Sequence, residues 1–294
     1  MKKDTKSYQK FCQVVCSLSL IITILLWTNQ AVAGPLAERI ANFPNWENKL
    51  SISAMEADLI YPDWMLGTWN VKSTLIELVA PLAPEIVTPG FENNRNSLNQ
   101  PINFQVRFIN FEPEKIITQT PQKKLINLPI SWNSIGKNQN NRKINLPKNA
   151  VIADREFNSL NISKAILGED AILSVKIDPN NPNRQTTILP DNLELLSVVT
   201  NRSSEILNQD EFIGCEISQQ IFQSETMIYL NEVETTTKYN HIISENQGEK
   251  IDAEQITAIY LSPQDPDYFL AGNRPVALYR YQLELLPVEM KNIQ

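Results

Sequence analysis

The sequence predicts a mainly β fold, a single antiparallel barrel with long loops and one short helix. Between positions 69 and 75, apolar and polar side chains alternate with the period of two that is typical of a strand with one buried face. Nine or ten segments with strand character follow one another, with short turns, little helix and no internal repeat. An antiparallel meander of this kind can close on itself, which removes exposed strand edges.

Residues 1–33 have the features of a secretory signal peptide. Lysines precede an apolar run at 14–27, and the small-x-small sequence at 31–33 provides a cleavage site before Gly34. The apolar run is short for a membrane span. We therefore expect an exported protein with no transmembrane span after cleavage; retention of the segment as an anchor is the alternative.

The barrel domain is predicted over 61–294, after a lead-in segment at 34–60. A polar, Asn-rich stretch at about 112–148 is interpreted as a surface insertion, because it has few apolar residues to contribute to a core. The short helix is expected at 160–167, ended by Gly168. The predicted strands are a first one that begins at Gly67, then 102–111, 150–157, 171–177, 185–189, 193–200, a segment from 212, 227–243 (one strand or a hairpin), 251–261 and 276–285.

Residue types that build common catalytic and metal sites are scarce. The chain has one histidine, eight glycines and three cysteines, of which only Cys215 follows the predicted cleavage site. One His and one Cys cannot build a zinc site, and no Gly-x-Ser-x-Gly elbow or Gly-rich phosphate loop is present. We expect neither a metal nor a cofactor, and His241 is expected to be a packed or rim residue rather than a catalytic base. The net charge of −7, without a basic stripe, disfavours nucleic-acid binding. The sequence thus favours a protein that is not an enzyme.

Tyrosines and threonines on the last strands are the candidate ligand-binding residues. In the segment 227–243 the two tyrosines share a face with Asn231 and two threonines, and two more tyrosines share a face on the last strand. Apolar walls with a few hydroxyl groups suit a small-molecule cavity; a filled core in which these groups are satisfied is the alternative. Glu232 and Glu234 lie on the opposite parity and are expected to be solvated outward charges. The candidate ligand-binding residues are Tyr229, Thr235, Tyr239, Tyr279 and Tyr281.

The opening of the first strand, Gly67-Thr68-Trp69, resembles the first strand of the calycin barrels, the lipocalins and fatty-acid-binding proteins. The resemblance implies that Trp69 plugs one end of the barrel and that an Arg near the last strand stacks on it. Arg280 is in that position, so we expect Gly67, Trp69 and Arg280 to close the barrel, with their strands paired and the guanidinium within ~6 Å of the indole. The sequence departs from the calycin pattern in one respect. Arg280 has the opposite parity to Tyr279 and Tyr281, so if it faces Trp69 the tyrosines face outward.

The whole sequence, with its predicted signal peptide, the run at 62–71 and the Tyr-Arg-Tyr motif at 279–281, resembles an uncharacterised family of exported proteins of cyanobacteria and chloroplasts. The resemblance implies the thylakoid lumen or the periplasm. Two functions remain open. The first is the binding of a small apolar ligand of the lipid or pigment class. The second is a non-enzymatic interaction or assembly factor of the photosynthetic membrane, with a filled barrel and a lumenal protein partner.

Overall fold

The computed structural model describes residues 34–54, 57–112, 146–178, 181–224, 228–246 and 248–288. The predicted signal peptide and most of the predicted insertion lie outside the described residues. Ten strands of the unit Leu36–Gln294 form one antiparallel sheet. This confirms the predicted mainly β, antiparallel fold. The strands are β1 (Gly67–Val79), β2 (Pro101–Asn110), β3 (Val151–Ala153), β4 (Ser174–Asp178), β5 (Asn181–Ile188), β6 (Glu194–Ile206), β7 (Glu211–Gln223), β8 (Ile228–Ser244), β9 (Gly248–Leu261) and β10 (Ala277–Pro287).

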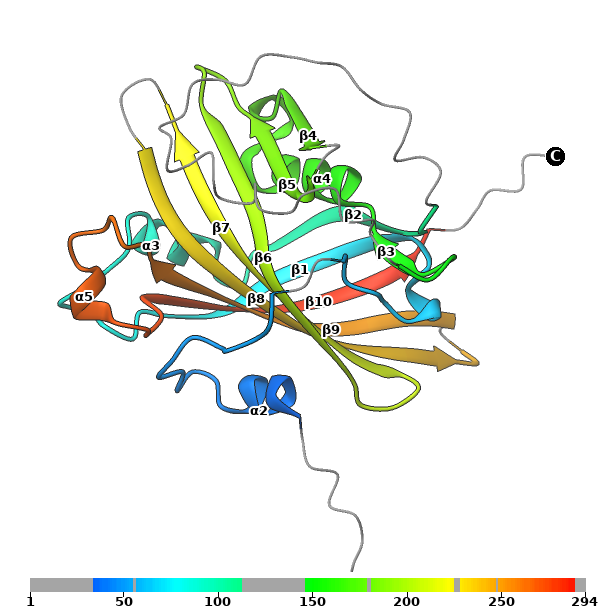
Figure 1. The fold of residues 1–294 in the computed structure, drawn as a ribbon. Coiled ribbons are helices and arrows are strands. Elements are labelled where there is room, and N and C mark those ends of the chain that lie inside the picture. Colours follow the sequence, from blue (N-terminus) through cyan, green and yellow to red (C-terminus); the bar gives the residue numbers. More distant parts are fainter. Residues whose placement is uncertain are drawn as a thin grey trace, which may run out of the picture. The chain divides into compact units, whose positions relative to one another are not determined.

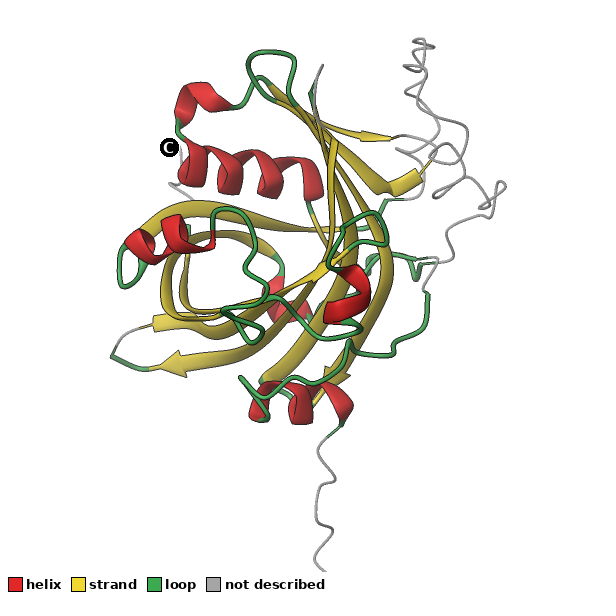
Figure 2. Cartoon of the chain, turned by 90° about the vertical axis from the view of Figure 1, so that its left-hand side faces the viewer, coloured by secondary structure: helices red, strands yellow, loops and turns green. Residues whose placement is uncertain are grey.

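The sheet has the order β3-β2-β1-β10-β9-β8-β7-β6-β5-β4 and curls into a half-barrel (Figures 1 and 2). Strand β1 pairs with β10, so the predicted pairing of the first and last strands is confirmed. Strands β3 and β4 are the two edges of the sheet, and in the described part of the chain they do not pair with each other. The sheet is therefore open rather than a closed ring.

Helix α4 (Arg155–Leu167) connects the two edge strands and packs against β2 and β4. It includes the predicted helix and ends at Gly168, which has a φ of 104°. It starts earlier than predicted because Asp154 is its N-cap, with Oδ1 accepting a hydrogen bond from the Phe157 backbone N–H at 3.2 Å. The strand expected at 150–157 accordingly stops at Ala153. The other helices are α2 (Pro35–Ala41), α3 (Phe91–Asn94), α5 (Tyr268–Ala271) and the 3₁₀ turns η1 (Asp63–Met65), η2 (Arg95–Ser97) and η4 (Glu169–Ala171).

Contacts of Tyr61 identify the concave face of the sheet. Its ring lies 4.8 Å from that of Phe108 on β2 and 5.5 Å from that of Phe212 on β7, centroid to centroid. Four strands separate β2 from β7 in the sheet, so one ring can reach both only on the side toward which the sheet curls. Directly opposed residues in an antiparallel pair share a face, and the register therefore assigns each strand residue to the concave or the convex side.

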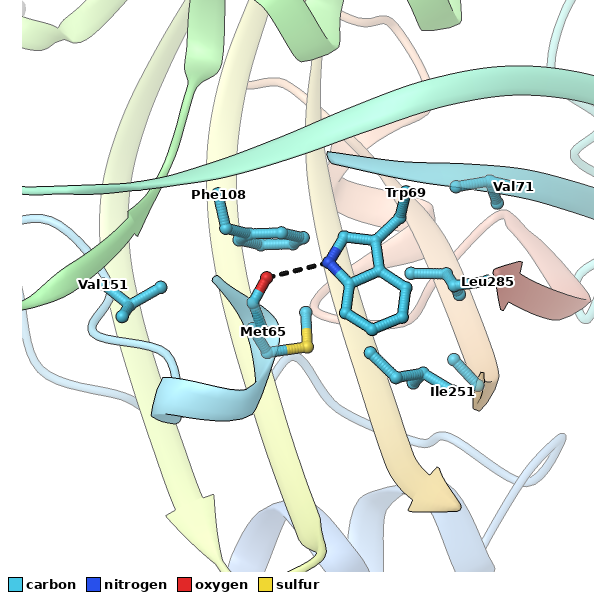
Figure 3. Packing of buried hydrophobic residues seen from close by; sticks show 8 residues of the cluster. Met65, Trp69, Val71, Phe108, Val151, Ile251 and Leu285 are labelled. Carbon is cyan, nitrogen blue, oxygen red and sulfur yellow. Dashed lines mark hydrogen bonds between the residues drawn. The ribbon is translucent and has the colours of Figure 1, made fainter. Parts of the chain in front are cut away.

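Trp69 is the centre of a buried cluster at one end of the concave face (Figure 3). It is 2% exposed, and its indole Nε1–H donates a hydrogen bond to the Met65 carbonyl at 2.8 Å. Met65 lies on η1, which begins after Pro62 and brings the chain across this end of the sheet. The cluster includes residues from β1, β2, β3, β9 and β10, so this end of the half-barrel is packed.

The stacking of Arg280 on Trp69 predicted from the calycin resemblance is wrong. The register places Trp69 opposite Pro287 and Arg280 opposite Glu77, eight residues further along β1, which is roughly 26 Å. Arg280 instead lies on the convex face, with Nε 2.8 Å from Glu254 Oε1 and the guanidinium 5.4 Å from the Phe43 ring. No close contact requires a glycine at position 67, because a Cβ there would meet nothing within 4 Å. Its φ of 125° is what favours glycine.

We expect the effects of substitutions at Trp69 and Arg280 to be additive. Trp69→Phe should lower the free energy of unfolding by about 1–3 kcal/mol, because it removes the hydrogen bond to Met65 and part of a buried ring. Arg280→Ala should cost less than about 1 kcal/mol, since that side chain is 35% exposed. Urea unfolding of the double variant should give the sum of the two losses within about 0.5 kcal/mol. A larger coupling would contradict the register.

Candidate functional site

Three of the five candidate ligand-binding side chains meet near the centre of the concave face. Thr235 on β8 lies opposite Thr257 on β9, which lies opposite Tyr279 on β10. In the next row, Gln255 lies opposite Tyr281. The tyrosines therefore face the concave side, as expected once Arg280 faces away from it. Thr257 and Gln255 complete this group and were not singled out from the sequence, although the parity of β9 was sufficient to find them.

The two other candidates lie toward the ends of the half-barrel. Tyr239 belongs to the packed end, where its ring is 6.2 Å from that of Phe212 and 6.4 Å from that of Tyr61. Burial raises the pKa of Tyr239 to about 12. Tyr229 lies toward the opposite end, with its ring 6.4 Å from that of Phe222. The structure thus separates these two tyrosines, which lie ten positions apart on β8, rather than bringing them together.

Near the middle of β8–β10, the two faces of the sheet differ in burial. On the convex face, Ile256, Ala258 and Leu278 are fully buried, because the segment that follows α2 covers them. On the concave face, Thr235, Thr257, Gln255 and Tyr281 are only half-buried, although the sheet curls around them. Side chains packed inside a filled barrel would be buried. The four side chains at the centre of the concave face therefore remain partly accessible, although neighbours on that face such as Thr237 and Tyr279 are buried.

A buried ionic network borders this central group. The carboxylate of Glu216, opposite Thr235 in the sheet, accepts hydrogen bonds from Arg202 Nε at 2.6 Å and from Arg155 Nη2 at 2.6 Å. Arg155, at the start of α4, also binds Asp58 through Nη2 and Nε, at 2.5 and 3.1 Å. Burial alone would raise the pKa of Glu216, but the two guanidinium groups outweigh it and lower the pKa to about 2. The network carries two positive and two negative charges.

Arg202 is the most deeply buried member of the network, with a side chain 1% exposed. Its Nη1 donates to the Ala57 carbonyl at 2.8 Å, and its Nη2 has no hydrogen-bond partner but lies 3.7 Å from Asp58 Oδ1. No pattern in the sequence predicts this network. Its members are up to 158 positions apart, and only the curl of the sheet and the position of α4 bring them together.

Segment 80–98 limits the site at the end away from Trp69. The Phe91 ring lies 6.0 Å from the Tyr279 ring, and the Tyr279 hydroxyl accepts a hydrogen bond from Asn94 Nδ2 at 3.0 Å. Tyr279 is 7% exposed. Among the candidates, Tyr281 and Thr235 are therefore more accessible to a ligand than Tyr279. Burial raises the pKa of Tyr281 to about 12, so its hydroxyl remains protonated.

A cleft of about 680 Å³ opens where β1 begins and β2 ends. Gly67, Arg107 and Phe108 line it, and Asp58 connects it to the ionic network. None of the five candidate residues lines this cleft. It is a second concave region of the surface, adjacent to the edge strand β3 through Ile152.

The sequence prediction for Glu234 is wrong, because this residue is fully buried on the convex face rather than solvated. Its carboxylate accepts hydrogen bonds from Arg39 Nε and Nη2 at 2.9 and 3.0 Å, and from the Tyr260 hydroxyl at 2.8 Å. The guanidinium of Arg39 lies 3.6 Å from the centre of the Trp46 ring. Parity correctly assigned Glu234 to the face opposite the tyrosines; it could not reveal that another segment covers that face.

The described residues contain no cluster of three His, Cys, Asp or Glu side chains suited to hold a metal ion. Nor does that part of the chain include a helix long and apolar enough to cross a membrane. The lone histidine, His241, stacks on Trp64 with centroids 5.0 Å apart, and its Nε2 is 2.8 Å from Glu249 Oε1. Its side chain is 7% exposed and lies at the packed end of the half-barrel.

Comparison with known proteins gives one match. A family model described as a domain of unknown function, DUF6816, matches residues 53–289, which is most of the chain and includes all ten strands. No curated protein and no solved structure matches the chain. The segment at 36–52, which covers part of the convex face, precedes the matched region. From the extent of the match, the chain belongs to the DUF6816 family.

Proposed function

We propose that this protein is an exported binding protein that holds a small, largely apolar molecule of the lipid or pigment class on its concave face. One observation carries the proposal: four central side chains of the concave face remain partly exposed, whereas Ile256, Ala258 and Leu278, on the convex side of the same part of the sheet, are fully buried. Around this centre, Val233, Ile259 and Phe222 provide apolar surface on the same face. A concave, mostly apolar surface with a few hydroxyl and amide groups has the composition of a small-molecule site.

Binding can be tested with a tryptophan that fills the site. Gln255→Trp introduces a large ring at the centre of the concave face and should reduce binding of an uncharged apolar fluorescent probe such as N-phenyl-1-naphthylamine at least tenfold. Gln282→Trp is the matched control, since Gln282 is an exposed residue of the same type on the neighbouring strand and faces the convex side. Fluorescence titration measures both. Equal loss of binding in the two variants, or in neither, would contradict a site on the concave face.

A second candidate function is the binding of a protein partner in the lumen or periplasm. It is favoured by α5, on which Phe269 is 90% and Leu270 61% exposed, since exposed apolar side chains that adjoin one another are common at interaction surfaces. Native mass spectrometry of the protein purified from its own source distinguishes the two functions. A bound small mass supports the first, and a co-purified polypeptide without such a mass supports the second.

A further inference from the structure

We infer that the ligand of the concave face is uncharged, and that a hydroxyl or carbonyl group of this ligand binds to Thr235, Thr257, Gln255 and Tyr281. The inference rests on the proposed function and names the class of molecule that the site accepts. It follows from which charges face the site, how they are paired, and which hydrogen-bonding groups remain.

The concave face offers no free charge to a ligand. Among the described positions of β1 and β6–β10 that face this side, the side chains that carry or can carry a charge are Arg202, Glu216, His241 and Glu249. Glu249 Oε1 lies 2.8 Å from His241 Nε2, away from the central group. Arg202 and Glu216 are bound to each other, and Asp58 and Arg155 complete a network without net charge. His241 lies beneath Trp64 at the packed end. Arg202 Nη2 lacks a hydrogen bond, but it is enclosed and close to Asp58.

A carboxylate or phosphate would meet an unfavourable environment at this site. Glu216, whose carboxylate is charged, lies directly opposite Thr235 in the sheet. Glu216 stays ionised at neutral pH because its pKa is about 2, so it repels an anion. Transfer of an ionised group from water to a site without a counter-ion is costly. A cation is also disfavoured, because both carboxylates of the network already bind guanidinium groups.

The remaining groups are suited to a neutral polar group. The hydroxyls of Thr235 and Thr257 can both donate and accept hydrogen bonds. The Gln255 Oε1 atom accepts from the Thr237 hydroxyl at 3.4 Å, which directs the amide Nε2 hydrogens to other partners. The Tyr281 hydroxyl stays protonated because burial raises its pKa. Together they provide several donors and acceptors next to one another, which match an alcohol, a ketone or an ester.

Retinol and retinoic acid provide a direct test, because they share one apolar body and differ in the charge of the polar group. At pH 7.5, retinol should bind at least tenfold more tightly than retinoate, as measured by quenching of tryptophan fluorescence. Retinoate that binds as tightly as retinol would overturn the inference while leaving the proposed function intact. If neither binds, and the Gln255→Trp variant binds the apolar probe like the wild type, the proposed function fails and the inference with it.

Two sets of variants locate the effect at the named residues. Thr235→Val and Thr257→Val should each weaken retinol binding about three- to tenfold through the loss of one hydroxyl, whereas Thr74→Val, on the convex face of β1, should not change it. Gln255→Arg supplies the missing cation and should reverse the preference toward retinoate; Gln282→Arg on the convex face is its control. Unchanged preference in a folded Gln255→Arg protein would overturn the assignment.

Discussion

Replacement of Glu216 by Ala is expected to lower the free energy of unfolding by about 3–5 kcal/mol, the range for a buried ion pair that loses one partner. The reason is Arg202, which is 1% exposed and depends on Glu216 for its shortest hydrogen bond. Glu211→Ala is a matched control on the same strand. Glu211 pairs with Lys238 at 3.0 Å, with side chains 28% and 35% exposed, so its removal should cost less than about 1 kcal/mol. Urea unfolding measures both values.

The dependence of this effect on pH provides a second measurement. In the folded protein the Glu216 carboxyl has a pKa of about 2, below its ordinary value of 4.5. Its contribution to stability is therefore fully present above pH 4.5 and is lost as the pH falls toward 2. The difference in unfolding free energy between the wild type and Glu216→Gln should be largest above about pH 5 and should shrink by roughly 3 kcal/mol toward pH 2. A difference that does not vary with pH would contradict the ion pairing.

The same network shows the limit of what the sequence predicts about the site. Which face a strand residue occupies is a local property with a period of two, so parity correctly grouped Thr235 with Tyr239 within β8 and Tyr279 with Tyr281 within β10. That both groups share the concave face follows only from the register of the three strands. Register is not local. It depends on turns, bulges and the packing of distant segments, and the shift in β1 between Leu75 and Glu77 is one such feature. The distance between Trp69 and Arg280 is a consequence of register, and the prediction from sequence resemblance failed for that reason.

Coverage of the sheet is also non-local. From the sequence, residues 34–60 were predicted to be a lead-in segment, and Glu232 and Glu234 on β8 were expected to be solvated. The structure instead uses residues 36–52 to cover part of the convex face, where Leu36 packs on Ile213 and Cys215. The alternation of residue types along a strand does not distinguish a buried Glu from an exposed one. The only indication is the presence of Arg39 and Trp46 in a segment that would otherwise be a simple linker.

We expect Glu234→Ala to detach this covering segment and to lower the free energy of unfolding by about 3–5 kcal/mol, because it leaves the guanidinium of Arg39, 10% exposed, without its carboxylate. Glu232→Ala is the matched control two residues away. Its partner Lys49 lies in the same segment at 2.6 Å, but the two side chains are 17% and 40% exposed, and the expected loss is below about 1 kcal/mol. If both variants lost the same stability, Glu234 would not be the principal anchor.

Cys215 reports whether the loss arises from detachment of the segment. Burial, with the Glu234 charge nearby, raises the pKa of its thiol to about 12, so the covered thiol should react slowly with a thiol reagent. In the chain from Gly34 onward it is the only cysteine, so its labelling rate is unambiguous. Glu234→Ala should increase that rate at least tenfold under conditions in which the sheet remains folded by circular dichroism. Arg39→Met combined with Glu234→Leu should restore slow labelling, because an apolar pair of similar size leaves no buried charge. Fast labelling in this double variant would mean that attraction within the ion pair holds the segment on the sheet. The effect of Glu234→Ala would then not arise only from the unpaired charge that it leaves on Arg39.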